Sequence, residues 1–168
     1  FCALWLMPNL FEFFNQYPTI NINIQASNRI ESLHKGDIDI AIRFSTSSTA
    51  AKDDSLIVQR FGENGVVPAC SPEFQTQMQL HSVKDMLGAR LLALAGEEKA
   101  SWEAYFEHSK INLSNKILRK TVVSSSDLAV SAALAGQGVM LASDVMIGQY
   151  LKSEQLVVPI DIPHPVRW

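Results

Sequence analysis

Residues that could contact a ligand, most of them polar, follow the predicted strands at four places in the chain. They are Ser27, then Arg43 with Phe44, then Ser71, and then the serine run Ser124, Ser125 and Ser126. In open α/β sheets, ligands bind outside the carboxyl ends of the strands, where helix N-termini present free N–H groups and the positive end of the helix dipole. Backbone N–H groups, hydroxyls and one guanidinium suit a small carboxylate. We therefore expect these strand ends, contributed by two lobes, to converge on one ligand-binding cleft.

Each of these groups also has a purely structural interpretation. Serine is a preferred residue at helix N-caps, and capping is the commoner role for any single serine. Arg43 could equally pair with a nearby acid such as Asp37 or Asp39. The prediction of a ligand site therefore depends on the whole set and not on any one member.

No enzyme signature is found in the sequence. There is no GxSxG elbow, HExxH pair or Walker loop, and the histidines lack the spacing of metal ligands. The histidines are His34, His81, His108 and His164. Gly136-Gln137-Gly138 closes a predicted helix and lacks the third glycine of a dinucleotide fingerprint. We expect no catalysis, metal or cofactor; a small α/β enzyme whose residues meet only in space is kept as an alternative.

Composition narrows the class of protein further. The chain has 168 residues, of which 47% are hydrophobic and 18% are charged, which excludes a disordered chain. Its net charge is −3 and its basic residues are scattered, which argues against nucleic-acid binding by this segment. Cys2 and Cys70 form no disulfide framework, and no stretch approaches the ~20 apolar residues of a membrane span. We expect a cytoplasmic protein with no membrane contact and, because it begins at Phe1, a piece of a longer chain.

Hydrophobic periodicity predicts a first α/β lobe over residues 1–64. Helical spacing runs from Leu6 to Tyr17, with Pro8 in the first turn, Pro18 as the stop and one buried stripe. Strict alternation or β-rich composition predicts strands over 20–26, 38–43 and 56–61. A capping box at Asn28 and a stop at Gly36 predict a helix between the first two, and residues 45–49 form a loop. Strand, helix and strand in succession imply a parallel sheet.

The pattern repeats in a second lobe over residues 65–168, after a hinge signal at residues 62–65. Strands are predicted over 66–69, 90–95, 116–123 and 139–142. Helices are predicted to begin after the caps Ser71 and Ser101, at the serine run and at Asp144. The chain is therefore expected to be an α/β protein of two lobes joined by a hinge.

Five segments carry a resemblance to a known family. They are WLMPNLFEFFNQYP, INIQAS, GDIDIAIRFS, VVPACSPEF and AALAGQGVMLAS, in that order along nearly the whole chain. Together they resemble the effector-binding domain of LysR-type transcriptional regulators, within a subgroup related to the glycine-cleavage activator. DIAIR is the most specific of these motifs.

The resemblance implies two Rossmann-like lobes of the type II periplasmic-binding-protein kind, with a small effector held between them. It places effector contacts at Phe1 and Cys2, and again at Ser27, Arg43, Phe44, Ser71, Ser124, Ser125 and Ser126. It also implies a homodimer or homotetramer, with Phe11 and Phe14 of the first helix near a side-by-side contact.

The family's winged helix-turn-helix is absent from this sequence, so DNA would be bound only through that missing part. The chain also stops about where the family crosses back to complete the first lobe. We expect a ligand-sensing domain of a bacterial transcription factor, in which effector binding changes the lobe arrangement. A solute-binding protein of a transport system, with the same two-lobed architecture, is the alternative.

Overall fold

The computed structural model describes residues 1–27, 33, 38–44 and 55–168. The chain divides into two compact units, residues 1–58 and residues 59–168. The lobe boundary expected at residues 64 and 65 stays a prediction.

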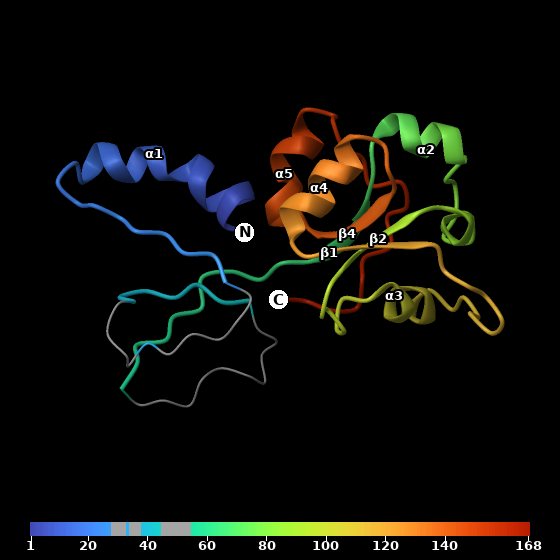
Figure 1. Ribbon diagram of the computed structural model, residues 1–168, viewed down its shortest axis with the longest axis horizontal. Coiled ribbons are helices and arrows are strands. Elements are labelled where there is room, and N and C mark those ends of the chain that lie inside the picture. Colours follow the sequence, from blue (N-terminus) through green and yellow to red (C-terminus); the bar gives the residue numbers. More distant parts are fainter. Residues whose placement is uncertain (28–32, 34–37, 45–54) are drawn as a thin grey trace. The chain divides into compact units, whose positions relative to one another are not determined.

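The first unit begins with a helix, as expected. A π-helical turn, Cys2–Leu6, in which the Leu6 N–H donates to the Phe1 carbonyl at 3.2 Å, leads into α1, Met7–Gln16 (Figure 1). Pro8 is the second residue of α1, as expected, and the fixed φ of proline fits the helical backbone there. Pro18 follows the C-cap Tyr17, as the sequence predicted. The π-helical turn was not predicted, because nothing in the side-chain spacing distinguishes it from an α-helical turn.

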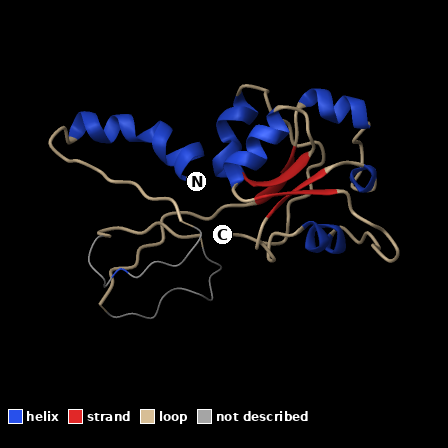
Figure 2. Cartoon of the chain, viewed as in Figure 1, coloured by secondary structure: helices blue, strands red, loops and turns tan. Residues whose placement is uncertain are grey.

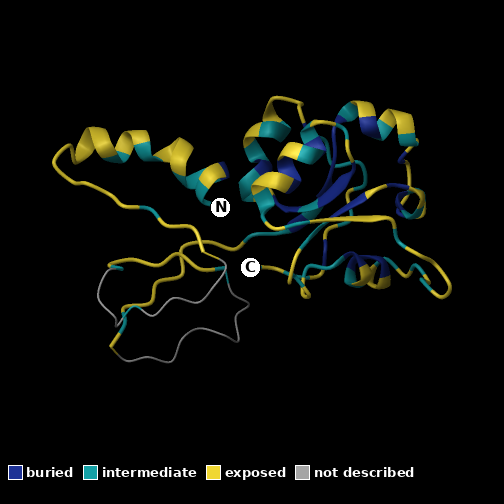
Figure 3. Cartoon of the chain, in the orientation of Figure 1, coloured by how far each residue is buried: buried dark blue, intermediate teal, exposed yellow. Residues whose placement is uncertain are grey.

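The buried stripe expected on this helix is only partly formed. Leu10 and Phe13 are half-buried, whereas Phe11 is 72% exposed and Phe14 is 41% exposed. No residue of α1 is fully buried (Figure 3). An amphipathic helix buries its apolar face only where another surface covers it, and the described residues of this unit cover α1 incompletely.

The strands expected in the first half are not formed. Residues 20–26 and 38–43, in the first unit, and residues 56–61, which cross into the second, have no strand structure. Ile20, Ile22 and Ile40 are 46%, 40% and 82% exposed. Alternation predicts only how side chains would divide between two faces, while a strand also needs a hydrogen-bonding neighbour, and no such ladder is present in the described part of this unit. The helix expected over 28–36, apart from residue 33, and the loop expected over 45–49 lie outside the described residues.

The second unit contains an open four-stranded sheet. Its strands, drawn in red in Figure 2, are β1 (Val66–Ala69), β2 (Leu91–Leu94), β3 (Lys120–Val123) and β4 (Val139–Ser143). Their spatial order in the sheet is β1-β4-β2-β3. β2 runs parallel to both β3 and β4. β1 instead runs antiparallel to β4, with Val66 opposite Ser143 and Ala69 opposite Met140. All four predicted strands are present, but β3 begins at Lys120 and not at Lys116 as predicted. The expectation of a parallel sheet is wrong for β1.

The predicted helices of this unit are also confirmed. They are α2 (Pro72–Met78), α3 (Trp102–His108), α4 (Ser126–Leu134) and α5 (Asp144–Lys152). The Ser71 hydroxyl accepts from the Phe74 N–H at 3.2 Å, and the Ser101 hydroxyl accepts from the Ala104 N–H at 3.3 Å. Gly136 ends α4 with a φ of +69°, a left-handed conformation that favours glycine. A short 3₁₀ helix, Asp85–Gly88, was not predicted.

Helices cover both faces of the sheet. Figure 1 shows α4 and α5 on one side and α3 on the other. On the α3 side, the buried rings of Trp102, Tyr105 and Phe106 pack with Leu91 and Val139 of the sheet. Burial of each such side chain contributes about 1.5–3 kcal/mol. None of the helices in the described part of the chain has the length and apolar character needed to cross a bilayer.

Candidate functional site

In the first unit, the structure brings together two of the predicted effector contacts. The rings of Phe1 and Phe44 meet edge to face, with their centroids 5.3 Å apart. Trp5 stacks on Phe1 at 5.0 Å, so the start of the first helix and the end of the DIAIR segment share one aromatic cluster. Cys2 lies next to this cluster and is half-buried. An aromatic wall of this kind could contact an apolar portion of a ligand.

Ser27 and Arg43 lie at the predicted places in the chain and are both exposed. Their segments are not strands, so the expectation that strand ends present them is not met in this unit. The structure describes Arg43 beside Phe44, which belongs to the aromatic cluster. The guanidinium is the cationic group in the predicted set.

In the second unit, the serine run follows the carboxyl end of β3, as predicted. Ser124 is exposed, while Ser125 and Ser126 are half-buried at the start of α4. Ser125 is the N-cap residue in an extended conformation, yet its hydroxyl makes no capping hydrogen bond. The first N–H groups of a helix have no partner within the helix. The hydroxyl and these N–H groups together form a donor set that suits an oxyanion.

Two further strand ends share this edge of the sheet, and the sequence analysis did not single them out. Because β2, β3 and β4 are parallel, the turn at Ala95 and Gly96 and the α5 N-cap Ser143 lie at the same edge as the serine run. The Ser143 hydroxyl is buried and has no hydrogen-bond partner. The strand-end rule that selected Ser124 would have found both, had it been applied to β2 and β4.

Ser71 does not join the serine run. Because β1 is antiparallel to β4, the end of β1 lies at the opposite edge of the sheet from the end of β3. Ser71 is 2% exposed, and its hydroxyl caps α2. The expectation that Ser71 and Ser125 face one gap is therefore wrong, and the capping interpretation of Ser71 is confirmed.

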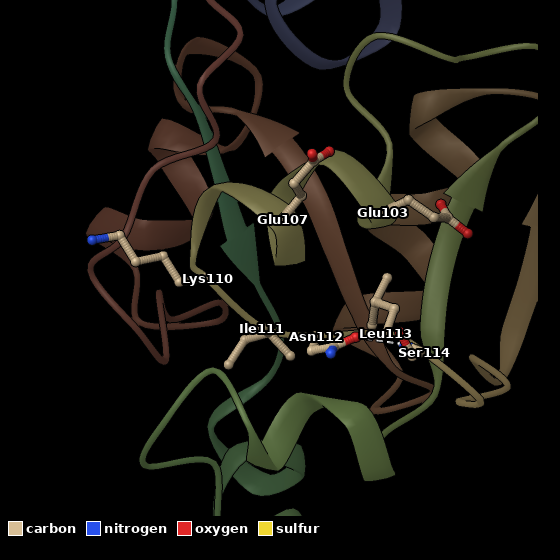
Figure 4. A pocket seen from close by; sticks show the side chains of 7 residues that line it. All are labelled: Glu103, Glu107, Lys110, Ile111, Asn112, Leu113 and Ser114. Carbon is tan, nitrogen blue, oxygen red and sulfur yellow. Dashed lines mark hydrogen bonds between the residues drawn. The ribbon is translucent and has the colours of Figure 1, made fainter.

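An open pocket of about 480 Å³ lies elsewhere, beside α3 and the loop after it. It is lined by Glu103, Glu107, Lys110, Ile111, Asn112, Leu113 and Ser114 (Figure 4). The Glu103 carboxylate is already paired with Lys120 of β3, and the side chains of Glu107 and Lys110 point in different directions. None of the predicted effector contacts lines this pocket.

Neither metal nor thiol chemistry is indicated by the described residues. Among them, no cluster of three or more histidine, cysteine or acidic side chains could hold an ion. Cys2 and Cys70 are both free thiols. Burial raises the pKa of the Cys70 thiol to about 12 and outweighs the hydrogen bond from the Gln75 backbone, so Cys70 is held as an unreactive thiol.

Relatives with curated descriptions are regulators of transcription. The chain is 30% identical over 162 residues to the glycine cleavage system transcriptional activator of Escherichia coli K12, covering 96% of this chain and 51% of that protein. It is 28% identical over 163 residues to the transcriptional activator AmpR of Rhodobacter capsulatus, covering 96% of this chain and 53% of that protein. The chain thus spans about half the length of these relatives.

Solved structures show the same relationship. The effector binding domain from Citrobacter freundii with three substitutions matches at 27% identity and a TM-score of 0.77, covering 96% of this chain and 78% of that one. The effector domain of AmpR from Pseudomonas aeruginosa matches at 26% identity and a TM-score of 0.73, covering 99% and 77%. The fold class is therefore α/β, of the type II periplasmic-binding-protein kind.

A family model described as the LysR substrate binding domain matches residues 1–168, the whole length of the chain. The order of the sequence motifs, the open sheet with the serine run at its edge and these relatives all agree with that match. The chain belongs to the LysR substrate-binding domain family.

Proposed function

We propose that this chain is the ligand-sensing domain of a cytoplasmic transcription regulator and that it has no catalytic activity. Its ligand is a small effector, an anionic metabolite or an amino acid. The observation that carries this proposal is the α4 N-terminus, where the Ser125 hydroxyl is not used as a cap and stands beside N–H groups that have no partner within the helix. The curated relatives reported above are named as regulators of transcription, which favours this function over solute transport.

We propose effector contacts in each unit. Ser124, Ser125 and Ser126 bind its carboxylate, while Ser27 and Arg43 supply further polar contacts. Phe1, Cys2 and Phe44 contact its apolar part, an assignment supported by the edge-to-face contact of the two phenylalanine rings. Ser71 is left out of this set because its hydroxyl caps α2.

In the full-length protein, a helix-turn-helix domain outside this sequence binds DNA. The effector binds one arrangement of the two lobes more tightly than the other, and so shifts the population of DNA-binding states.

The exposed face of α1, with Phe11 and Phe14, forms a contact in a homodimer or homotetramer. Phe11→Glu should lower the molar mass measured by light scattering, whereas Glu12→Gln on the same helix should not.

Calorimetry with a panel of amino acids and small organic acids tests the effector site. For any ligand that binds, Ser125→Ala removes one hydrogen bond to a charged group, worth about 1.5–3 kcal/mol, and should weaken binding by roughly ten- to hundredfold. Arg43→Gln should weaken the binding of anionic ligands by a similar factor.

Ser131→Ala is the matched control, because Ser131 is an exposed serine on the same helix. It should leave the affinity unchanged. Equal affinity in the wild type and Ser125→Ala would remove the α4 N-terminus from the binding site, and an absence of binding across the whole panel would count against the proposed ligand class.

A further inference from the structure

His164 lies buried where two distant parts of the chain run side by side. Asn64 and Trp168 exchange both backbone hydrogen bonds, at 2.7 and 3.0 Å, and the His164 N–H donates to the Val66 carbonyl at 2.8 Å. Four residue steps from 164 to 168 therefore span the same length as two steps from 64 to 66. The segment 164–168 bulges as a result, as an antiparallel ladder does when one side carries extra residues.

The bulge leaves the Val166 N–H without the carbonyl that a regular ladder would offer. The Nδ1 atom of the His164 ring takes that place and accepts from the Val166 N–H at 3.0 Å. A ring nitrogen that accepts carries no proton, so the proton of the neutral ring is on Nε2. Nε2 lies 3.1 Å from the Ser101 carbonyl and donates to it.

Both ring nitrogens are thus used, but only the neutral ring can use both in this way. A second proton would enter on Nδ1 and turn it from an acceptor into a donor facing another donor, the Val166 N–H. We propose that His164 is a pH-dependent switch for the segment 164–168. The neutral ring holds the bulge in place, and the doubly protonated ring releases it. The Ser101 contact survives the change, because Nε2 donates in both states.

The surroundings of the ring favour its neutral form. His164 is 3% exposed, and its ring stacks on Tyr105 of α3 with centroids 6.3 Å apart. Burial first, and then the charge of His108, lower the pKa of His164, while the Ser101 contact and Glu97 act in the opposite direction. On the chain segments beside it, Arg167 and Asp144 both lie near Gly65. The net lowering of the His164 pKa favours the neutral ring, and so the closed bulge, at neutral pH. Acidification favours the doubly protonated ring and the release of the segment.

Hydrogen exchange at the Val166 amide tests this proposal in the 168-residue chain. In the released segment the ring has the ordinary histidine pKa of about 6.5, whereas in the held segment it stays neutral over this range. The equilibrium constant for opening, corrected for the intrinsic exchange rate, should then rise up to about tenfold between pH 7.5 and pH 5.5. His164→Asn replaces Nδ1 with an amide oxygen that accepts without titrating, so its Val166 protection should not vary over this range. His108→Asn removes the nearby histidine and should keep the dependence on pH.

A second measurement needs no variant. The ¹⁵N signals of the His164 ring in the wild type should show an unprotonated Nδ1 and a protonated Nε2 at pH 7.5, and protonation of Nδ1 should follow the loss of Val166 protection. Protection that stays constant from pH 7.5 to pH 5.5 would overturn the proposal. A proton on Nδ1 at pH 7.5, or an equal dependence on pH in His164→Asn, would overturn it as well.

Discussion

Gly138 offers a quantitative test of how β2 and β4 are held together. A Cβ atom at this buried position would lie 2.5 Å from the Arg90 carbonyl oxygen, a backbone atom. That oxygen accepts the Val139 N–H at 2.9 Å, so it cannot withdraw without breaking the hydrogen bond that begins the β2–β4 contact. The second glycine of Gly136-Gln137-Gly138 thus has a role in packing and not in dinucleotide binding.

Gly138→Ala should destabilise the chain by about 2–4 kcal/mol. Of this, about 1–3 kcal/mol is the cost of overpacking and about 1 kcal/mol is the lost backbone hydrogen bond. For a chain of this size, the midpoint of thermal unfolding should fall by roughly 4–16 °C, at about 2–4 °C for each kcal/mol. Urea unfolding followed by circular dichroism measures the free energy directly.

Gly148→Ala provides the matched control. Gly148 lies inside α5, and a Cβ atom there would have no neighbour within 4 Å. Alanine is the better helix former, so this variant should be more stable than the wild type by about 0.5–1 kcal/mol. The argument from close backbone approach is refuted if Gly138→Ala unfolds at the same urea concentration as the wild type.

Three further predictions concern the second unit. Trp102→Phe replaces an indole of a residue that is 2% exposed with a smaller ring and removes its 2.9 Å hydrogen bond to the Leu92 carbonyl, and should cost about 2–4 kcal/mol in urea unfolding. Ser71→Ala removes the cap on the Phe74 N–H, and should cost about 1 kcal/mol without changing effector affinity in calorimetry. The backbone N–H of residue 81, and then the hydroxyl and N–H of residue 82, donate to the Asp85 carboxylate and lower its pKa below 3.8. The Asp85 carboxylate therefore contributes to stability above its unfolded-state pKa of 3.8, and this contribution is lost as the pH falls through its lower folded-state pKa. The difference in unfolding free energy between the wild type and Asp85→Asn should shrink below about pH 4.

The second unit could be predicted well because its signals are local. Ser71 and Ser101 cap their helices as expected, and Gly136 ends α4 in the left-handed conformation that its position requires. The direction of β1 could not be predicted, because residues 66–69 have the same buried character whether the neighbouring strand is parallel or antiparallel. In the first half, the alternation of Ile20, Ile22 and Ile24 carries no information about a partner strand.

The candidate site could be predicted only where it depends on elements that are neighbours in the sequence. The position of the serine run depends only on β3 and α4, which are neighbours in sequence, and it is found as expected. The position of Ser71 depends on the direction of a strand whose partner lies about seventy residues away, and there the prediction is wrong. Ser143 and Gly96 also lie at or just after strand ends, as Ser124 does, so their positions follow from the same local signal.

The reversal of β1 also brings its first residue to the edge of the sheet that carries the serine run. Val66, at the start of β1, lies at the same edge of the sheet as Ser124, and residues 64–66 are joined to residues 164–168 by three backbone hydrogen bonds. Two segments about one hundred residues apart in the sequence are thus joined at the edge of the sheet that carries the serine run. At the opposite edge, next to Ser71, Cys70 and Val157 exchange backbone hydrogen bonds at 3.1 and 2.8 Å, so the C-terminal part of the chain is joined to both ends of β1.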